Sequence, residues 1–235
     1  MSFLKDTLAV FKKTEVSFLE KRKESDNVYT FRFKKEKDVS WHAGQYALFT
    51  ITHKKIKKAT RPFTISSSPT EDVIQITSVI NEKPSEFKQA LLELEKGMTV
   101  KMSGSVGTFY SQGNAPLLLI AGGIGVTPFR AMIKQLESEG MNQNRPIKLI
   151  HVDGQTSHIF KDELESIVNN IPIDIMYLES RENLHKEIDA FVTVHKADAH
   201  YYVAGPKSMV EDTTKHLQES NIPKANIKKD AFFGY

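Results

Sequence analysis

PLLLIAGGIGVTPFR, residues 116–130, is the stretch that decides the fold of the carboxyl-terminal half of the chain. Its first part is a continuous apolar run, which is typical of a strand buried on both faces of a parallel sheet. Three glycines follow, and helical spacing begins after them. A helix amino terminus attracts phosphate, and glycines let a ligand approach the backbone. The stretch predicts a strand, a tight turn and a helix, with either a nucleotide phosphate or only close packing as the reason for the glycines.

The same succession of strand and helix repeats through the rest of the chain. Apolar runs at 147–152, 173–179 and 199–205 each precede a stretch with helical spacing. Such alternation predicts a parallel sheet with right-handed crossovers. The last run leads into a second turn, at Gly205 and Pro206. Because parallel-sheet proteins bind ligands at the carboxyl ends of their strands, two glycine turns at one edge favour a nucleotide site.

The amino-terminal part of the chain has a different pattern. Turn residues separate short β-rich runs at 28–34, 46–52, 73–80 and 98–104. This spacing is typical of an antiparallel barrel or sandwich. One helical stretch interrupts the runs, with Ser85 as a suitable N-cap and Gly97 as its end.

The two patterns together predict a two-domain chain. We expect an N-terminal antiparallel β-barrel over residues 1–112, in which residues 1–13 form a helical extension. An α/β Rossmann-like domain with a parallel sheet should follow over residues 113–235. The change of pattern places the boundary near 111–116.

Composition narrows the class of protein. Of the 235 residues, 40% are hydrophobic and 26% are charged, which is ordinary for a globular protein. No run of about 18 apolar residues and no secretory signal occurs, so we expect a cytoplasmic protein without a membrane span. The absence of cysteine excludes disulfides, thiol nucleophiles and a cysteine-ligated iron–sulfur cluster from this chain. The eight histidines lack the spacing of metal motifs, so no metal is expected.

Charge is divided unevenly along the chain. Residues 1–112 carry 19 Lys and Arg against 13 Asp and Glu, whereas the remainder carries 13 against 16. Four of the lysines lie close together, at Lys54, Lys55, Lys57 and Lys58. A solvated hairpin loop is the simpler interpretation of these lysines, and a docking patch for an acidic partner is the more specific one. No aromatic-studded basic motif accompanies these lysines, so nucleic acid is not an expected partner.

An arginine, an aromatic ring and a series of hydroxyls follow one another in RPFTISSSP, residues 61–69. Arginine offers a rigid fork of donors that suits phosphate. The neighbouring ring offers a flat surface, and a threonine hydroxyl can donate and accept hydrogen bonds to a heteroatom. The combination suits a ligand with a pyrophosphate at one end and a polar aromatic system at the other, as in a flavin dinucleotide. The three serines that follow are interpreted as turn and strand-end residues.

The motifs of the chain, taken in order, resemble those of the ferredoxin–NADP⁺ reductase family of flavoproteins, which includes flavin reductases and flavohaemoprotein reductase domains. The resemblance lies in Ala43-Gly44-Gln45-Tyr46, Arg61-Pro62-Phe63-Thr64, GSVGTF (104–109), AGGIGVTP (121–128), Ala204-Gly205-Pro206 and the terminal AFFGY. These motifs cover nearly the whole chain, from about Val16 to Tyr235. The resemblance implies a β-barrel that binds FAD and an α/β domain that binds NAD(P)H.

The same resemblance implies roles for individual residues. Arg61 would pair with the FAD pyrophosphate, Phe63 would pack on the flavin or ribityl chain, and Thr64 would hydrogen-bond flavin N5. Thr64 and Tyr235 are therefore the expected catalytic residues. Further FAD contacts are expected from Tyr46, Pro62, Ser78, Val79, Ser85, Phe233 and Tyr235. The expected NAD(P) contacts are Gly122, Gly123, Ile124, Gly125, Val126, Thr127, Pro128, Gly205 and Pro206.

The implied activity is transfer of hydride from NAD(P)H to flavin N5, followed by passage of electrons to a separate acceptor such as a small, acidic redox protein. One alternative is a reductase for which free flavin is a substrate that leaves, and another is an electron-transfer or nucleotide-sensing subunit of a larger complex. The sequence leaves NADH and NADPH open. Asp153 suits a ribose hydroxyl, whereas His158 and Lys161 suit a phosphate.

Overall fold

The computed structural model describes residues 9–140, 145–154 and 158–232 of the 235-residue chain. The chain divides into two compact units, Met1–Tyr110 and Ser111–Tyr235. Each unit contains a single sheet with its own core.

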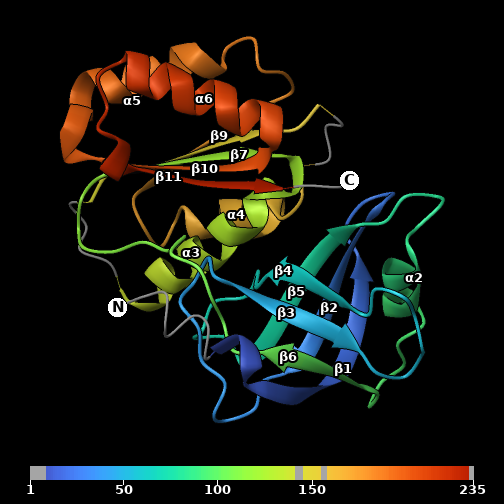
Figure 1. The fold of residues 1–235 in the computed structure, drawn as a ribbon. Helices are drawn as coiled ribbons and strands as arrows, with labels where there is room; N and C mark the ends of the chain where they lie inside the picture. The colour runs from blue at the N-terminus through green and yellow to red at the C-terminus, as the bar shows by residue number, and fades with distance from the viewer. Residues whose placement is uncertain (1–8, 141–144, 155–157, 233–235) are drawn as a thin grey trace. The chain divides into compact units, whose positions relative to one another are not determined.

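The first unit is an antiparallel six-stranded sheet that curls toward a barrel (Figure 1). Its strands are β1 (Lys13–Lys23), β2 (Val28–Lys34), β3 (Tyr46–Ile51), β4 (Thr60–Thr64), β5 (Val73–Val79) and β6 (Thr99–Ser103). Their spatial order is β4-β3-β6-β1-β2-β5. The edge strands β4 and β5 meet just beyond β4, where the Ser66 N–H donates to the Gln75 carbonyl at 2.7 Å. The predicted antiparallel barrel is confirmed.

The barrel core is built mainly from aromatic and β-branched side chains on alternate strand positions. Phe31, Phe33 and Phe49 are almost fully buried, and Phe33 contacts Phe49 with ring centroids 5.8 Å apart. The short helix α2 (Glu86–Leu92) covers one end of the core with Phe87, Ala90 and Leu91. Because strand side chains alternate between the two faces, this core leaves the opposite face of each strand available for other contacts.

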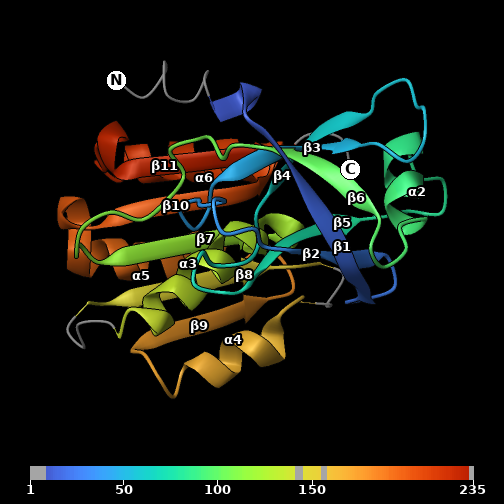
Figure 2. The same ribbon diagram turned by 90° about the horizontal axis from the view of Figure 1, so that it is seen from below.

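The second unit is a parallel five-stranded sheet of order β11-β10-β7-β8-β9. Its strands are β7 (Leu117–Gly122), β8 (Ile147–Val152), β9 (Ile173–Leu178), β10 (His200–Pro206) and β11 (Ile227–Phe232). Its α-helices are α3 (Thr127–Ser138), α4 (Lys161–Ile167), α5 (Leu184–His195) and α6 (Lys207–Glu219). Figures 1 and 2 show α5 and α6 together on one face of this sheet, with α3 and α4 on the other. The predicted Rossmann-like architecture is confirmed.

The strand order of the second unit contains a point where the chain reverses direction across the sheet. From β7 the chain adds β8 and then β9 on one side, and it returns to add β10 and β11 on the other side of β7. In open α/β sheets this switch point, here between the carboxyl ends of β7 and β10, is where ligands bind. The fold thus singles out the turn after Gly122 and the turn at Gly205.

The predicted helical extension at the amino terminus is short in the described part of the chain. Residues 9–11 are helical and β1 begins at Lys13, while residues 1–8 lie outside the described residues. Strand β1 reads KTEVSFLEKRK, in which only Val16 and Phe18 are buried, so charged residues conceal it in the sequence.

Candidate functional site

The glycine turn after β7 is a single turn of 3-10 helix, η1 (Gly123–Val126), that leads directly into α3 at Thr127. Gly123 has φ +51°, and a Cβ placed there would meet no atom of the described residues within 4 Å. The Thr127 hydroxyl donates to the Ile124 carbonyl at 3.0 Å, and Pro128 lies in the first turn of α3. Proline suits that position because the first helical N–H groups have no partner within the helix. Gly123 is thus a left-handed position with open space at its side-chain position.

The neighbouring glycines have a different physical role. A Cβ on Gly125 would lie 2.2 Å from the Ala204 carbonyl oxygen, and one on Gly122 would lie 2.6 Å from the Met209 sulfur. Gly205 has φ +147°, and a Cβ there would lie 3.0 Å from the Gly122 backbone. These three glycines let the turn after β7 approach the turn after β10 more closely than any side chain would allow. Close packing therefore accounts for these three glycines, whereas a ligand beside Gly123 stays a prediction.

A buried histidine supports this turn from the adjacent strand. His151, on β8, is 0% exposed, and its Nε2 lies 3.0 Å from the Gly123 carbonyl oxygen. Burial lowers the pKa of His151 to about 4, although its hydrogen bond with Gly123 acts in the opposite direction. No sequence pattern singles out this residue, because one histidine in an apolar strand gives no signal of its partner.

His151 belongs to an aromatic cluster at the carboxyl ends of β8 and β9. Its ring contacts that of His158 edge-on at a centroid distance of 5.0 Å, and His158 contacts Tyr177 at the same distance. Burial also lowers the pKa of His158 and raises that of Tyr177. The cluster is therefore neutral near pH 7, since both imidazoles lose their protons well before the phenol ionises.

The residues that the sequence offered for the adenosine ribose lie beside this cluster. Asp153 follows β8, is 9% exposed, and its N–H donates to the Leu178 carbonyl at 2.9 Å. Lys161 lies over the Tyr177 ring, with Nζ 5.0 Å from the centroid. His158 is buried and its Nδ1 has no hydrogen-bond partner among the described residues. Burial therefore favours the neutral form of His158, and the ribose and phosphate contacts expected of these three residues stay predictions.

Thr64 lies on β4, beside Tyr46 on β3, and Arg61 lies three residues earlier on the same strand. Tyr46 and Thr64 are directly opposite each other in the antiparallel register. Tyr46 is 39% exposed, and a Cβ on Gly107 would lie 3.2 Å from its ring, so its position is constrained from one side. Side chains of directly opposed residues share one face of a sheet. The structure therefore brings an open aromatic ring and a hydroxyl together.

Arg61 itself is half-buried and lies opposite Phe49 in the same register. Within the described part of the chain, its guanidinium has no hydrogen-bond or ion-pair partner. A guanidinium removed from water is normally paired, because leaving a partly buried charge without a partner is costly. The arrangement fits an anionic group such as the FAD pyrophosphate, and the exposed Tyr46 ring fits an aromatic ligand.

The other residues of RPFT have local partners. Phe63 is half-buried and stacks on Phe87 of α2 at a centroid distance of 5.6 Å, while Pro62 is exposed. Ser85 caps α2, and its hydroxyl accepts from the Lys88 N–H at 3.4 Å. The ring contact thus brings β4 against the first turn of α2. Of these residues, Ser85 has its hydroxyl engaged by its own helix.

The serines after Thr64 serve the hairpin between β4 and β5. Ser66, Ser67 and Ser68 are 0% exposed, and the Ser66 hydroxyl donates to the Gln75 carbonyl at 3.2 Å. The Ser66 hydroxyl also lies 3.2 Å from the Thr77 hydroxyl, which lies 2.9 Å from that of Thr30. These contacts agree with the interpretation of the serines as turn and strand-end residues.

Of the remaining predicted FAD contacts, two are buried or half-buried and two lie outside the described residues. Ser78 is buried at the end of β5, where its hydroxyl donates to the Val79 carbonyl at 3.2 Å, and Val79 is half-buried. Phe233 and Tyr235 lie outside the described residues. Their predicted roles over the flavin therefore stay predictions.

One more carboxyl group at the switch-point edge was not selected from the sequence. Asp230, on β11, lies in register with Ala204 on β10, next to the turn at Gly205. Burial raises the pKa of Asp230 to about 6. The sequence does not indicate this burial, because three charged residues in a row, Lys228, Lys229 and Asp230, are typical of an exposed strand.

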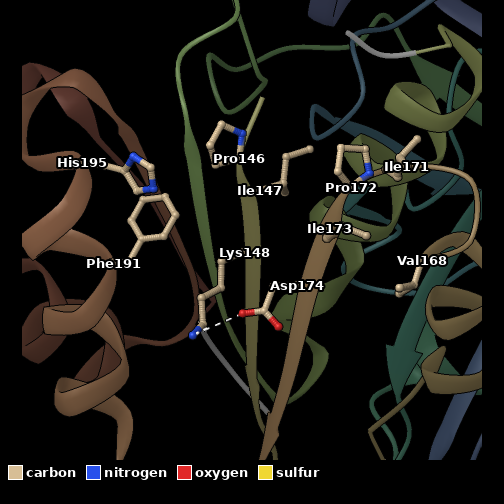
Figure 3. Close-up of a pocket in the computed structure, with 10 residues that line it drawn as sticks. All are labelled: Pro146, Ile147, Lys148, Val168, Ile171, Pro172, Ile173, Asp174, Phe191 and His195. Carbon is tan, nitrogen blue, oxygen red and sulfur yellow. Dashed lines mark ion pairs between the residues drawn. The ribbon is translucent and has the colours of Figure 1, made fainter. Parts of the chain in front are cut away.

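A groove of about 510 Å³ lies at the opposite ends of β8 and β9 (Figure 3). It is lined by Pro146, Ile147, Lys148, Val168, Ile171, Pro172, Ile173, Asp174, Phe191 and His195. Lys148 forms an ion pair with Asp174 at 3.4 Å beside it. Lys148 and Asp174 lie at the beginning of β8 and β9, whereas the glycine turns lie at the carboxyl ends of β7 and β10. The groove is therefore separate from the candidate nucleotide edge.

Two further features of the described residues bear on the class of protein. None of the described helices is both long enough and apolar enough to cross a membrane. Among the same residues, no group of three or more histidine, aspartate and glutamate side chains is arranged to hold a metal ion.

Two family models match this chain, one over its first part and one over its second. Residues 9–126 match the model of the FAD-binding domain family, and residues 119–215 match that of the oxidoreductase NAD-binding domain. These two matches define a class of oxidoreductase that binds FAD through a barrel and a nicotinamide nucleotide through a parallel sheet. The chain belongs to the FAD-binding domain family, in an arrangement that resembles ferredoxin–NADP⁺ reductases.

Curated relatives match most of this chain but are longer. Flavohemoprotein B of Dictyostelium discoideum is 25% identical over 76% of this chain and 46% of its own length. The toluate 1,2-dioxygenase electron transfer component of Pseudomonas putida is 27% identical over 74% and 54%. The flavohemoprotein of Burkholderia sp. strain TH2 is 26% identical over 91% and 57%. The chain thus spans about half the length of the curated relatives it matches.

Solved structures share the fold over nearly their full length. A ferredoxin-NADP⁺ reductase from Plasmodium falciparum superposes with a TM-score of 0.80 and 18% identity, covering 97% of this chain and 99% of that one. The flavohem-like FAD/NAD-binding domain of the nitric oxide dioxygenase from Vibrio cholerae gives 0.75 and 19%, covering 93% and 98%. Both likenesses establish the two-domain fold.

Proposed function

We propose that this protein is a flavoenzyme that oxidises NAD(P)H and delivers the electrons to a separate acceptor. The proposal is carried by two observations: a half-buried Arg61 on the barrel that has no partner among the described residues, and an open left-handed Gly123 at the switch point of the parallel sheet. One site suits the charged and aromatic parts of FAD, and the other suits a dinucleotide phosphate. Bound FAD would accept a hydride from NAD(P)H and release electrons to the acceptor.

We assign FAD binding to residues 1–112 and NAD(P) binding to residues 113–235, as the sequence predicted. Arg61 would neutralise the pyrophosphate through its fork of donors, and Thr64 would offer its hydroxyl to the edge of the flavin. Tyr46, which lies opposite Thr64, would give a flat contact surface. No general base is required of this chain for hydride transfer, so its work is to bind and orient.

The nucleotide side of the proposal depends on the turn after β7. The N–H groups at the start of η1 and α3 would face the pyrophosphate of NAD(P)H, where the helix end favours negative charge. Ile124, Val126, Thr127 and Pro128 give this turn its shape, and Gly205 with Pro206 closes it from the β10 side. The absence of a Cβ at Gly123 leaves room for the ligand.

We further propose an acidic redox protein as the acceptor, acting in the cytoplasm. Three observations support this choice: the excess of basic residues in the first unit, the exposed lysines between β3 and β4, and the electron transfer component among the relatives. Lys54 is paired with Glu93 at 2.8 Å, whereas Lys55, Lys57 and Lys58 are exposed without an ion-pair partner in the described chain.

An anaerobic titration tests the proposed function. The purified chain is loaded with FAD, dialysed, and titrated with NADH and with NADPH while the flavin absorbance is followed. We expect one FAD per chain and bleaching by at least one of the two nucleotides. Arg61→Gln should lower FAD retention by about 10-fold or more, since a charge-assisted hydrogen bond contributes about 1.5–3 kcal/mol. Lys101→Gln, which removes an exposed cation elsewhere on the barrel, is the matched control.

Three outcomes of this titration are informative. A protein that takes up no FAD contradicts the proposal. A protein that reduces added flavin but loses it on dialysis would instead be a free-flavin reductase. A protein that retains FAD but is bleached by neither nucleotide would indicate a nucleotide-sensing or electron-transfer subunit.

A further inference from the structure

We propose that His151 is a positioning residue for the dinucleotide: it holds the Gly123 carbonyl and thereby fixes the turn that receives the nucleotide phosphate. The inference rests on the proposed function, because it concerns the affinity of that same site for NADH or NADPH. The inference goes beyond the proposed function because it assigns a role to a side chain of the sheet that lies behind the turn.

The geometry restricts the hydrogen bond to one direction. A carbonyl oxygen accepts but does not donate, so His151 Nε2 carries the proton in the 3.0 Å contact with Gly123. The neutral ring then has a bare lone pair on Nδ1, and this atom has no hydrogen-bond partner among the described residues. Among the described residues, the His151 ring therefore makes one polar contact, and that contact is with the turn.

The Gly123 carbonyl is an effective place to control the turn. Gly123 has φ +51°, a conformation that is open to glycine but also readily left by it, because glycine has a wide choice of backbone angles. A hydrogen bond from a rigid strand residue reduces that choice. The N–H groups that follow along η1 then keep the orientation that a phosphate requires.

The surroundings of His151 make its own position rigid. The ring is 0% exposed, it contacts the rings of His158 and Tyr177, and β8 is hydrogen-bonded between β7 and β9. A buried polar group is retained in a core only when its hydrogen bond compensates for its removal from water. A leucine or methionine would fill this position without that requirement, so packing alone does not account for the histidine.

Two variants of His151 separate positioning from packing. His151→Gln keeps a donor at nearly the position of Nε2, whereas His151→Met keeps volume and removes the donor. Leu149→Val is the control for general destabilisation, because Leu149 is 0% exposed on the same face of β8 and is in register with Leu119 rather than the turn. The full-length, FAD-loaded protein is used throughout.

Equilibrium binding of NAD⁺ and NADP⁺ is measured first, followed by the rate of flavin reduction at saturating NADH and NADPH. We expect His151→Met to weaken nucleotide binding by about 2- to 12-fold, the range of one net hydrogen bond, with less than about 2-fold change in the saturated rate. His151→Gln should bind within about 2-fold of the original protein. Leu149→Val should lower the melting temperature without weakening binding.

A readout on the unsubstituted protein does not depend on any variant folding. Nitrogen-15 NMR of the imidazole should show the Nε2–H tautomer of His151, unchanged on addition of nucleotide. Binding by His151→Met equal to that of the original protein, or an Nδ1–H tautomer, overturns the inference and leaves the proposed function intact. An original protein that binds neither nucleotide overturns the proposed function and this inference with it.

Discussion

At the scale of single residues, the buried histidine on β8 makes stability depend on pH. The pKa of His151 is about 4 in the folded protein, against an ordinary value of about 6.5 when unfolded. Between these values the unfolded chain binds a proton that the folded chain does not, so the free energy of unfolding falls as the pH is lowered. The contribution is fully present above pH 6.5 and is lost progressively toward pH 4.

We therefore expect the free energy of unfolding to drop by roughly 2 kcal/mol between pH 6.5 and pH 5 on account of His151, at about 1.4 kcal/mol per pH unit. Asp230 acts in the opposite direction, because its pKa is raised to about 6 and folding is favoured when it is protonated. Urea unfolding of the original protein and of His151→Gln at both pH values isolates the histidine, since Asp230 is common to both. Equal pH dependence in the two proteins would contradict this expectation.

Gly123 and Gly125, both at the switch point, differ in how well they tolerate an added side chain. Gly125→Ala would place a Cβ 2.2 Å from the Ala204 carbonyl oxygen, so the two turns must separate. Gly123→Ala meets no atom within 4 Å and is penalised only by its φ of +51°, which costs roughly 1–2 kcal/mol.

We expect Gly125→Ala to unfold at a clearly lower temperature than Gly123→Ala and to lose nucleotide binding, while Gly123→Ala is destabilised less and loses affinity more selectively. Thermal melts and NAD(P)⁺ binding of both variants provide the comparison. Equal melting temperatures for the two would show that the turns are not in the close contact described.

At the scale of elements, α3 and α4 are joined by a partly buried ion pair. Arg130 on α3 is 5% exposed, and its Nε donates to a carboxylate oxygen of Glu163 on α4 at 2.8 Å, with a second bond from its terminal nitrogen. The guanidinium also lies over the Phe160 ring at 5.4 Å. Removing the carboxylate takes these two bonds away from a buried cation, which is unfavourable.

Glu163→Ala should therefore destabilise the protein by about 1–3 kcal/mol, measured by urea unfolding. Glu165→Ala on the same helix is the control, because Glu165 is half-exposed and pairs with Lys161 at 3.8 Å. An exposed pair of this kind contributes about 0.5 kcal/mol or less. A Glu163→Ala effect no larger than that of the control would contradict the assignment.

The elements also show what sequence patterns can and cannot predict. Strands β2 and β8 match their predicted ranges, since alternation and continuous apolar runs follow directly from how strand faces are buried. Strand β1 lacks such a pattern because it carries charges on most positions. The glycine turns were predicted from residue type, whereas the roles of His151 and Asp230 depend on neighbours from other strands that no local pattern reveals.

At the scale of the whole molecule, the uneven distribution of charge predicts how an acceptor is recognised. Reversal of Lys55, Lys57 and Lys58 to Glu spares Lys54, which is paired with Glu93. We expect KM for an acidic [2Fe–2S] ferredoxin, used as the probe, to rise several-fold at low salt, because the positive patch steers association. The dependence of that KM on ionic strength should weaken.

Reduction of a neutral quinone provides the control for this charge reversal, since an uncharged acceptor does not sense the lysines. Its turnover should remain unchanged in the triple variant. Unaltered ferredoxin kinetics would exclude the lysines as a docking patch and leave them as a solvated loop.

The hydroxyl contacts behind the β4–β5 hairpin have a directional consequence. Ser66 gives its only hydroxyl proton to the Gln75 carbonyl, so Thr77 must donate to Ser66, and Thr30 must in turn donate to Thr77. The three O–H dipoles therefore all point in the same direction along this row, from Thr30 toward the Gln75 carbonyl. Thr77→Val interrupts this row in its middle and should lower the melting temperature more than Thr30→Val, which only shortens it at one end.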